Sequence, residues 1–146
     1  MVGYSLGKRD LNLFKTIVKN SFILSSITGL VISIVYFFIN QYVINLMSDI
    51  EEVRILSSQY VIWLIILPFI ASFCYQFDGI FIGVSQTKEL RNAMIFSVFC
   101  YLLISILLTK YYSNNGIWIS LCVFMILRAG SLFYYLDRIY LRFSSR

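Results

Sequence analysis

An aspartate lies inside the hydrophobic stretch PFIASFCYQFDGIFIG, residues 68–83, where Asp78 is the only charged residue. The stretch gives way to the polar run QTKELRN, residues 86–92. An ionisable group inside a lipid bilayer is costly unless it is paired or hydrated, so such groups usually mark an ion or substrate pathway. The stretch therefore favours a membrane transport protein.

The composition supports a membrane location. Of the 146 residues, 60% are hydrophobic and 13% are charged, and the mean hydropathy is +0.82. Soluble domains are only about half apolar. The net charge of +5 comes from basic residues scattered among the loops, not from one patch, so we expect no nucleic-acid partner. The lipid bilayer is the expected partner.

Windows without charged residues predict the number of membrane crossings. A helix needs roughly 20 apolar residues to span a bilayer about 30 Å thick. The alternation of a β-barrel is absent, and only helices or closed barrels satisfy their backbone groups in lipid. We therefore expect an all-α integral membrane bundle in a single domain, residues 1–146, with a cytoplasmic tail at 137–146. The four predicted spans are residues 21–47, 61–84, 93–109 and 117–136.

The basic residues predict the orientation. Nine of them flank one side of the predicted spans, and only Arg54 and Lys110 lie on the other. Because cytoplasmic loops of membrane proteins are enriched in Lys and Arg, we expect both termini and the loop at 85–92 to face the cytoplasm of the inner membrane. The nine residues are Lys8, Arg9, Lys15, Lys19, Lys88, Arg91, Arg138, Arg142 and Arg146.

Residue types argue against a metal centre and against an enzyme. The chain has no histidine, and its three cysteines, Cys74, Cys100 and Cys122, each fall inside a predicted span. There cysteine usually packs as a small hydrophobe. We expect no metal and no cofactor.

The first 20 residues predict a loop followed by a helix. Gly3 and Gly7 are expected to interrupt regular structure over residues 1–10, and Asp10 is expected to cap the next helix. Apolar residues then recur at helical spacing. This segment is either an interfacial helix or a plain extension of the first span.

The order of these features resembles a known family. A Gly-x-x-x-Gly segment ending in basic residues and an acid (Gly3 to Asp10) precedes a long span, Pro68, the sequence DGIFIG at 78–83 and KELRNAM at 88–94. Together with LRAGSL at 127–132, this order resembles the last third of a multidrug and toxic compound extrusion (MATE) transporter of the DinF-like branch. The resemblance implies a fold of twelve helices in two lobes. The chain would supply helices nine to twelve, part of the C-terminal lobe.

The resemblance also implies an activity. Such transporters export cationic or amphipathic compounds as sodium ions or protons enter, and Asp78 matches a tenth-helix acid that some members use for cation coupling. The first-helix acid attributed to the DinF-like branch lies outside this chain, so we expect no export without helices one to eight, whether these form one chain with it or a second. The start at Met1, at the edge of a family loop, predicts a partial or split gene. A non-transporting four-helix regulatory protein and a fragment of a lipid-linked oligosaccharide flippase are the alternatives.

Three roles remain open for Asp78 on sequence grounds. It could couple transport to a cation, form a static ion pair with Arg128, or face a hydrated vestibule. At 1.5 Å per residue, Asp78 lies about 9 Å and Arg128 about 12 Å from the cytoplasmic ends of their spans, so their depths nearly match.

Other residues of the second span have weaker signals. Pro68 would kink this span, either as a gating hinge or as a structural bend. Gly79 and Gly83 favour close helix packing over a substrate-lining role. Tyr75 and Gln76 are candidates for a cavity wall.

Overall fold

The computed structural model describes residues 1–144, and within them it contains six helices and no strand. Four helices are long and apolar enough to cross a membrane, which confirms the predicted all-α membrane fold. Arg146 lies outside the described residues. The helices are α1 (Val2–Gly7), α2 (Leu11–Met47), α3 (Glu51–Ser58), α4 (Val61–Gly83), α5 (Thr87–Tyr112) and α6 (Asn114–Ser144).

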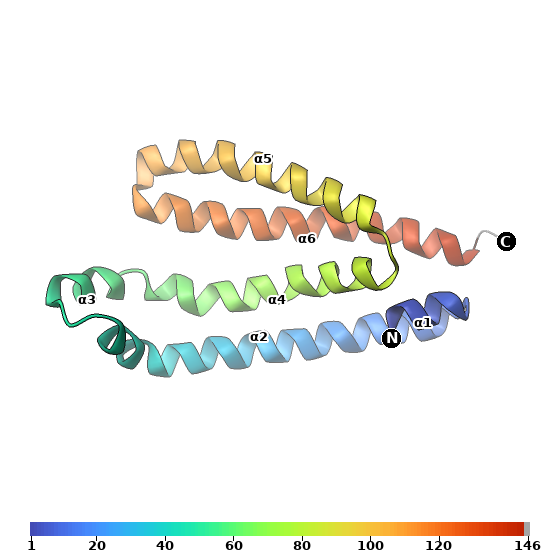
Figure 1. Ribbon diagram of the computed structural model, residues 1–146, viewed down its shortest axis with the longest axis horizontal. Helices are drawn as coiled ribbons and strands as arrows, with labels where there is room; N and C mark the ends of the chain where they lie inside the picture. Colours follow the sequence, from blue (N-terminus) through green and yellow to red (C-terminus); the bar gives the residue numbers. More distant parts are fainter. Residues whose placement is uncertain (145–146) are drawn as a thin grey trace.

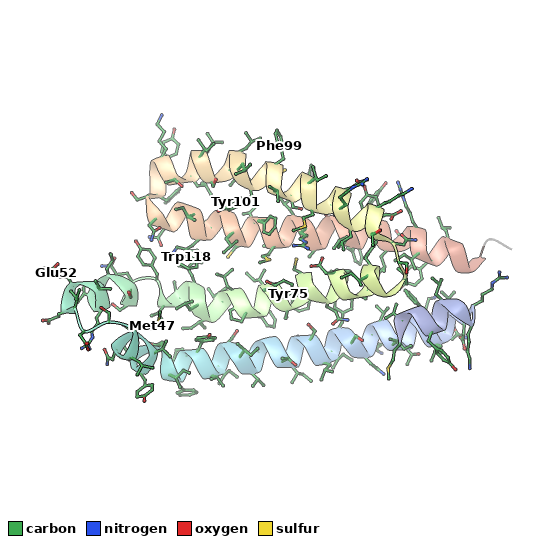
Figure 2. The ribbon with its side chains drawn as sticks, viewed as in Figure 1. Met47, Glu52, Tyr75, Phe99, Tyr101 and Trp118 are labelled. Atoms are coloured by element: carbon green, nitrogen blue, oxygen red, sulfur yellow. The ribbon has the colours of Figure 1, made fainter. Side chains whose placement is uncertain are left out.

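The four long helices lie side by side in the order α2, α4, α6, α5 (Figure 1). The N-terminus and the last described turns of α6 lie at one end of the molecule, together with α1 and the α4–α5 turn. We call this the terminal end. The opposite end, which we call the α3 end, carries α3 and the α5–α6 turn. Glu52 and Met47 mark the α3 end in Figure 2.

The loop predicted for residues 1–10 is wrong, because Val2–Gly7 form α1. Gly3 is a contact residue here: a Cβ atom at this position would lie 2.5 Å from the carbonyl oxygen of Gly83. The glycine therefore lets α1 approach α4 instead of breaking a helix. The predicted cap is confirmed, since the Leu13 N–H donates to the Asp10 carboxylate over 2.9 Å. Because α2 runs without interruption from Leu11, its first residues extend the first span.

The α3 end also differs from the prediction. The predicted spans leave residues 110–116 between them, but α5 and α6 are separated only by Ser113, which has φ 51°. A Cβ atom on Gly116 would lie 2.5 Å from the carbonyl oxygen of Leu108, so glycine is needed for this tight hairpin. The short helix α3 was not predicted from the sequence; its first turn carries Glu51 and Glu52. Acidic residues stabilise a helix N-terminus.

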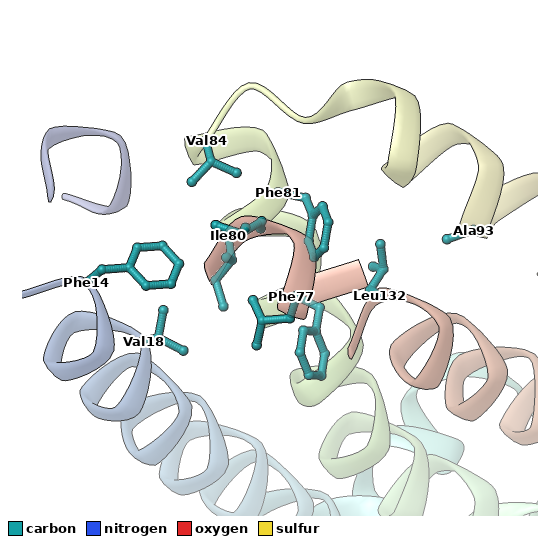
Figure 3. Close-up of a cluster of buried hydrophobic side chains, with 10 residues drawn as sticks. Phe14, Val18, Phe77, Ile80, Phe81, Val84, Ala93 and Leu132 are labelled. Carbon is teal, nitrogen blue, oxygen red and sulfur yellow. The ribbon is translucent and has the colours of Figure 1, made fainter. Parts of the chain in front are cut away.

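Buried apolar residues gather at the terminal end, where α2, α4 and α6 meet (Figure 3). We call this group the core cluster. Phe14, Ile80, Phe81, Leu132 and Ile139 have no exposed surface. Only 6–22% of the most apolar 18-residue stretch of each long helix is buried, so most of this surface is available to lipid or to other helices. The core cluster comprises Phe14, Val18, Phe77, Ile80, Phe81, Val84, Ala93, Leu132, Leu136 and Ile139.

Candidate functional site

Asp78 on α4 and Arg128 on α6 form an ion pair next to the core cluster. Arg128 Nη2 donates to Asp78 Oδ2 over 2.8 Å, and the two side chains are only 12% and 13% exposed, respectively. Phe77 and Leu132, each close in sequence to one partner, belong to the core cluster. The contact agrees with the matched depths of the two residues in the sequence.

One atom of each group is left out of the pair. Asp78 Oδ1 and Arg128 Nε are both buried and have no hydrogen-bond partner among the described residues. A guanidinium can engage a carboxylate through two parallel N–H···O bonds, which are stronger than one. Buried charged groups that lack partners cost free energy. The pair is therefore held by less than its full bonding capacity.

A separate groove lies between α2 and α4 and has a volume of about 500 Å³. Three residues singled out from the sequence line it: Pro68, Tyr75 and Gln76. Tyr75 is labelled on α4 in Figure 2 and is 60% exposed. The groove is thus where the predicted cavity residues come together. Its other lining residues are Ser21, Leu24, Ser25, Thr28, Gly29, Ile32, Ala71 and Ser72.

The hydroxyl groups of serine and threonine give this groove its polar character. These residues were not predicted as part of a site. Ser25 Oγ donates to the carbonyl oxygen of Ser72 over 2.8 Å, and Ser72 Oγ donates to that of Phe69 over 2.7 Å. The available signal was the helical spacing of Ser21, Ser25 and Thr28 within an uncharged span. Since these hydroxyls still have acceptor capacity, the groove offers weakly polar contacts within the apolar part of the bundle.

The ion pair and the groove are different sites on α4. Asp78 follows Tyr75 by three residues, which places them about 60° apart around the helix. The groove opens between α4 and α2, whereas Asp78 faces Arg128 on α6. Asp78 is therefore at the border of the groove-bearing face and is not part of its wall. No group of three or more His, Cys, Asp or Glu that could hold a metal occurs among the described residues.

Comparison with known proteins gives the family. The MatE family matches residues 1–111, which include Asp78 but not Arg128. The chain belongs to the MatE family. DNA damage-inducible protein F (DinF) of Escherichia coli strain K12 is 32% identical to the chain over 130 residues, which are 89% of the chain. The chain spans only about 28% of the length of that relative. No solved structure matches the chain.

The MatE family consists of transporters, not enzymes, and the four long apolar helices make this chain part of a multi-pass membrane protein. The four long helices and the ion pair agree with this assignment.

The glycines of this MatE chain divide between two surroundings. Gly83 packs against α1, where a Cβ atom on the glycine would lie 3.3 Å from Val2 Cβ. At Gly79, no atom of the described residues lies within 4 Å of such a Cβ atom. Gly29 was missed: its Cβ would lie 2.7 Å from Ser72 Oγ, so it allows the close approach of α2 and α4. Pro68 lies inside α4, and its role as a hinge remains a prediction.

Proposed function

We propose that this chain supplies helices nine to twelve of a MATE-type efflux transporter of the DinF-like branch. The observation that carries the proposal is Asp78, the only acidic residue within the four predicted spans, paired with a cation on a neighbouring helix. Structural ion pairs in membranes exist, but an intramembrane carboxylate in a transporter family is a candidate for the coupling site. The likeness to DinF supports the choice of branch.

The proposed activity is exchange of cationic or amphipathic compounds for sodium ions or protons. A carboxylate away from water favours its protonated form, whereas a bound sodium ion favours the ionised form. One carboxylate can therefore hold a proton or another cation, but not both at once. This exclusion is what an exchanger needs. The groove near Tyr75 and Gln76 offers an apolar wall with hydroxyls, which suits an amphipathic compound.

The proposed location is the inner membrane, with the terminal end in the cytoplasm. The unequal distribution of Lys and Arg between the two ends supports this orientation. We also propose that the chain alone exports nothing. In alternating-access transporters the substrate lies between two halves that move against each other, and four helices provide only part of one half.

The test is a fusion of this chain to the part of DinF that precedes its matching segment. We expect the fusion, expressed in a bacterium lacking its own exporters, to extrude an ethidium-like cation in a sodium- or pH-dependent manner. Asp78→Asn should abolish this efflux while the fusion remains folded in the membrane. Asp49→Asn, in the exposed Arg–Asp pair, is the matched control and should keep full activity. Robust cation-dependent efflux by the chain alone would contradict the proposal.

A further inference from the structure

We propose that Arg128 is a tethered counter-cation: its guanidinium occupies the Asp78 carboxylate until an incoming cation displaces it. Arg128 thereby determines which cations this carboxylate accepts. The ligands that fit are small organic cations with at least two N–H donors, such as guanidinium or amidinium groups. The physiological meaning of this inference rests on the proposed exchange function, although binding can be measured without transport.

The incomplete pair is the first reason. Nη2 lies 2.8 Å from Oδ2, while Nε and Oδ1 are buried without hydrogen-bond partners among the described residues. These are two of the four atoms that a side-on, two-bond contact would join. A free guanidinium is not restrained by the backbone of α6 and can donate to both oxygens of Asp78. It therefore offers a hydrogen bond to Oδ1, which Arg128 leaves without a partner.

Charge is the second reason. A guanidinium stays protonated under all ordinary conditions, so the pair as a whole is neutral. A sodium ion or proton would neutralise Asp78 but would supply no N–H donor, and Arg128 would then be left unpaired at a depth where unpaired charges are costly. A cation that donates hydrogen bonds to both carboxylate oxygens of Asp78 offsets more of this free-energy cost. Organic cations with paired N–H donors should therefore compete better than sodium.

The position of Arg128 is the third reason. Asp78 lies on α4, whereas Arg128 lies on a different helix, α6. Arg128 is itself largely buried, and Leu132 and Leu136 on the same helix belong to the core cluster. The competitor is thus provided by a different part of the chain from the carboxylate, and it can be altered without changing the carboxylate itself.

The chain contains a matched pair for comparison. Arg54 also lies near an aspartate, Asp49, but the distance is 3.5 Å and Asp49 is fully exposed. Arg54 Nε donates to the carbonyl oxygen of Ser48 over 2.6 Å, and Nη2 donates to that of Asn45 over 3.3 Å. Water reaches the Asp49 carboxylate freely. Removing Arg54 should therefore create no binding site for a guanidinium.

The experiment is chemical rescue in the full chain, reconstituted in phosphatidylcholine nanodiscs. Arg128→Ala should melt at a lower temperature than the unaltered chain, and methylguanidinium should restore about 5 °C or more of that loss. It should bind Arg128→Ala at least about tenfold more tightly than the unaltered chain, because the tethered competitor is gone. Sodium at the same concentration should restore less. Arg54→Ala should show no rescue.

The double variant Asp78→Asn with Arg128→Ala decides whether the carboxylate is the site. Rescue that persists in this variant would overturn the proposal, as would equal rescue by sodium or equal methylguanidinium affinity in Arg128→Ala and the unaltered chain. If Arg128→Ala does not fold, Arg128→Lys replaces it. A lysine is a weaker two-bond partner, so methylguanidinium should bind Arg128→Lys more tightly than the unaltered chain; equal affinity would overturn the proposal.

The transport test and the binding test can fail independently of each other. If the DinF fusion does not extrude cations but Arg128→Ala is rescued in nanodiscs, the proposed efflux function is wrong and the binding inference stands. If the fusion is active and the rescue is absent, Arg128 is a structural partner of Asp78 and the inference is wrong.

Discussion

Each end of the molecule has an ion pair between an arginine and an aspartate, but the two pairs lie in opposite surroundings. At the α3 end, Arg54 lies on α3, 3.5 Å from Asp49, and α3 has no buried residue. Towards the terminal end, Arg128 and Asp78 meet at 2.8 Å beside the core cluster. Surface ion pairs contribute little, whereas a buried pair is costly to break because one charge is left without a partner. The surroundings, rather than the residue types, therefore determine which pair matters.

The largest expected difference between the ends is the side of the membrane on which each lies. In a background without Cys74, Cys100 and Cys122, single cysteines at Glu51 or Asn114, both at the α3 end, should react fully with an impermeant thiol reagent in intact cells. A cysteine at Lys88, at the terminal end, should react only after the cells are permeabilised. Labelling of Lys88 from outside would contradict the proposed orientation.

The next largest effect concerns the buried pair. Asp78→Asn leaves the Arg128 guanidinium without its carboxylate and should destabilise the chain by about 3 kcal/mol or more, measured by thermal unfolding in detergent. Adding Arg128→Gln should recover part of that loss, because the two changes together remove both charges. Strictly additive losses in the double variant would show that the two residues do not interact.

The contrast between the ends also shows what the sequence could predict. Charge-free windows placed α4 within one residue of its observed end, because polar residues closely flank that span. They did not predict the ends of α5 and α6, which extend into polar residues as far as Thr87 and Asn114. Charged residues mark where lipid ends, but a helix can continue into water. Depth along a helix suggested the contact between Asp78 and Arg128, since both lie in well-defined spans.

Features that depend on two helices could not be predicted from one segment at a time. Gly3 looks like a helix breaker until Gly83 is placed beside it, and α1 was missed for this reason. The groove was only partly predicted. Tyr75 and Gln76 on α4 lie close to Asp78 in the sequence and were predicted as cavity residues, whereas Ser25 and Thr28 on α2 line the groove only because α2 packs next to α4. The partial bonding of the ion pair is likewise a property of the assembled structure.

Packing at the two ends can be compared with two isoleucines. Ile80 in the core cluster has no exposed surface, whereas Ile55 on α3 is 57% exposed. Ile80→Ala should leave a cavity between α2, α4 and α6 and cost about 2 kcal/mol or more, by the same unfolding measurement. Ile55→Ala should have a much smaller effect. Similar losses for the two variants would mean that the core cluster does not hold the helices together.

A smaller effect is expected from the glycines of α1. Gly3→Ala would place a methyl group 2.5 Å from the Gly83 carbonyl oxygen, a backbone atom, so α1 would have to move. Overpacking of this kind costs about 1–3 kcal/mol. Gly7→Ala is the control: no atom lies within 4 Å of the new methyl group among the described residues, and alanine favours a helix. Gly7→Ala should be neutral or stabilising, and faster hydrogen exchange in α1 should be confined to Gly3→Ala.

The smallest effects should come from the exposed pair of Arg54 and Asp49. They distinguish the contact of Arg54 with Asp49 from its hydrogen bonds to backbone carbonyl groups. Asp49→Asn removes a carboxylate that is fully exposed to water, so the melting temperature should not change measurably at any salt concentration. Arg54→Ala also removes the hydrogen bonds to the carbonyl oxygens of Ser48 and Asn45 at the C-terminal end of α2. These carbonyl groups have no partner within the helix, and a cation beside them is favourable, so this loss should be about 1 kcal/mol. An Asp49→Asn effect as large as that of Arg54→Ala would show that the exposed pair itself stabilises the chain, and the contrast between the two ends would then be one of degree.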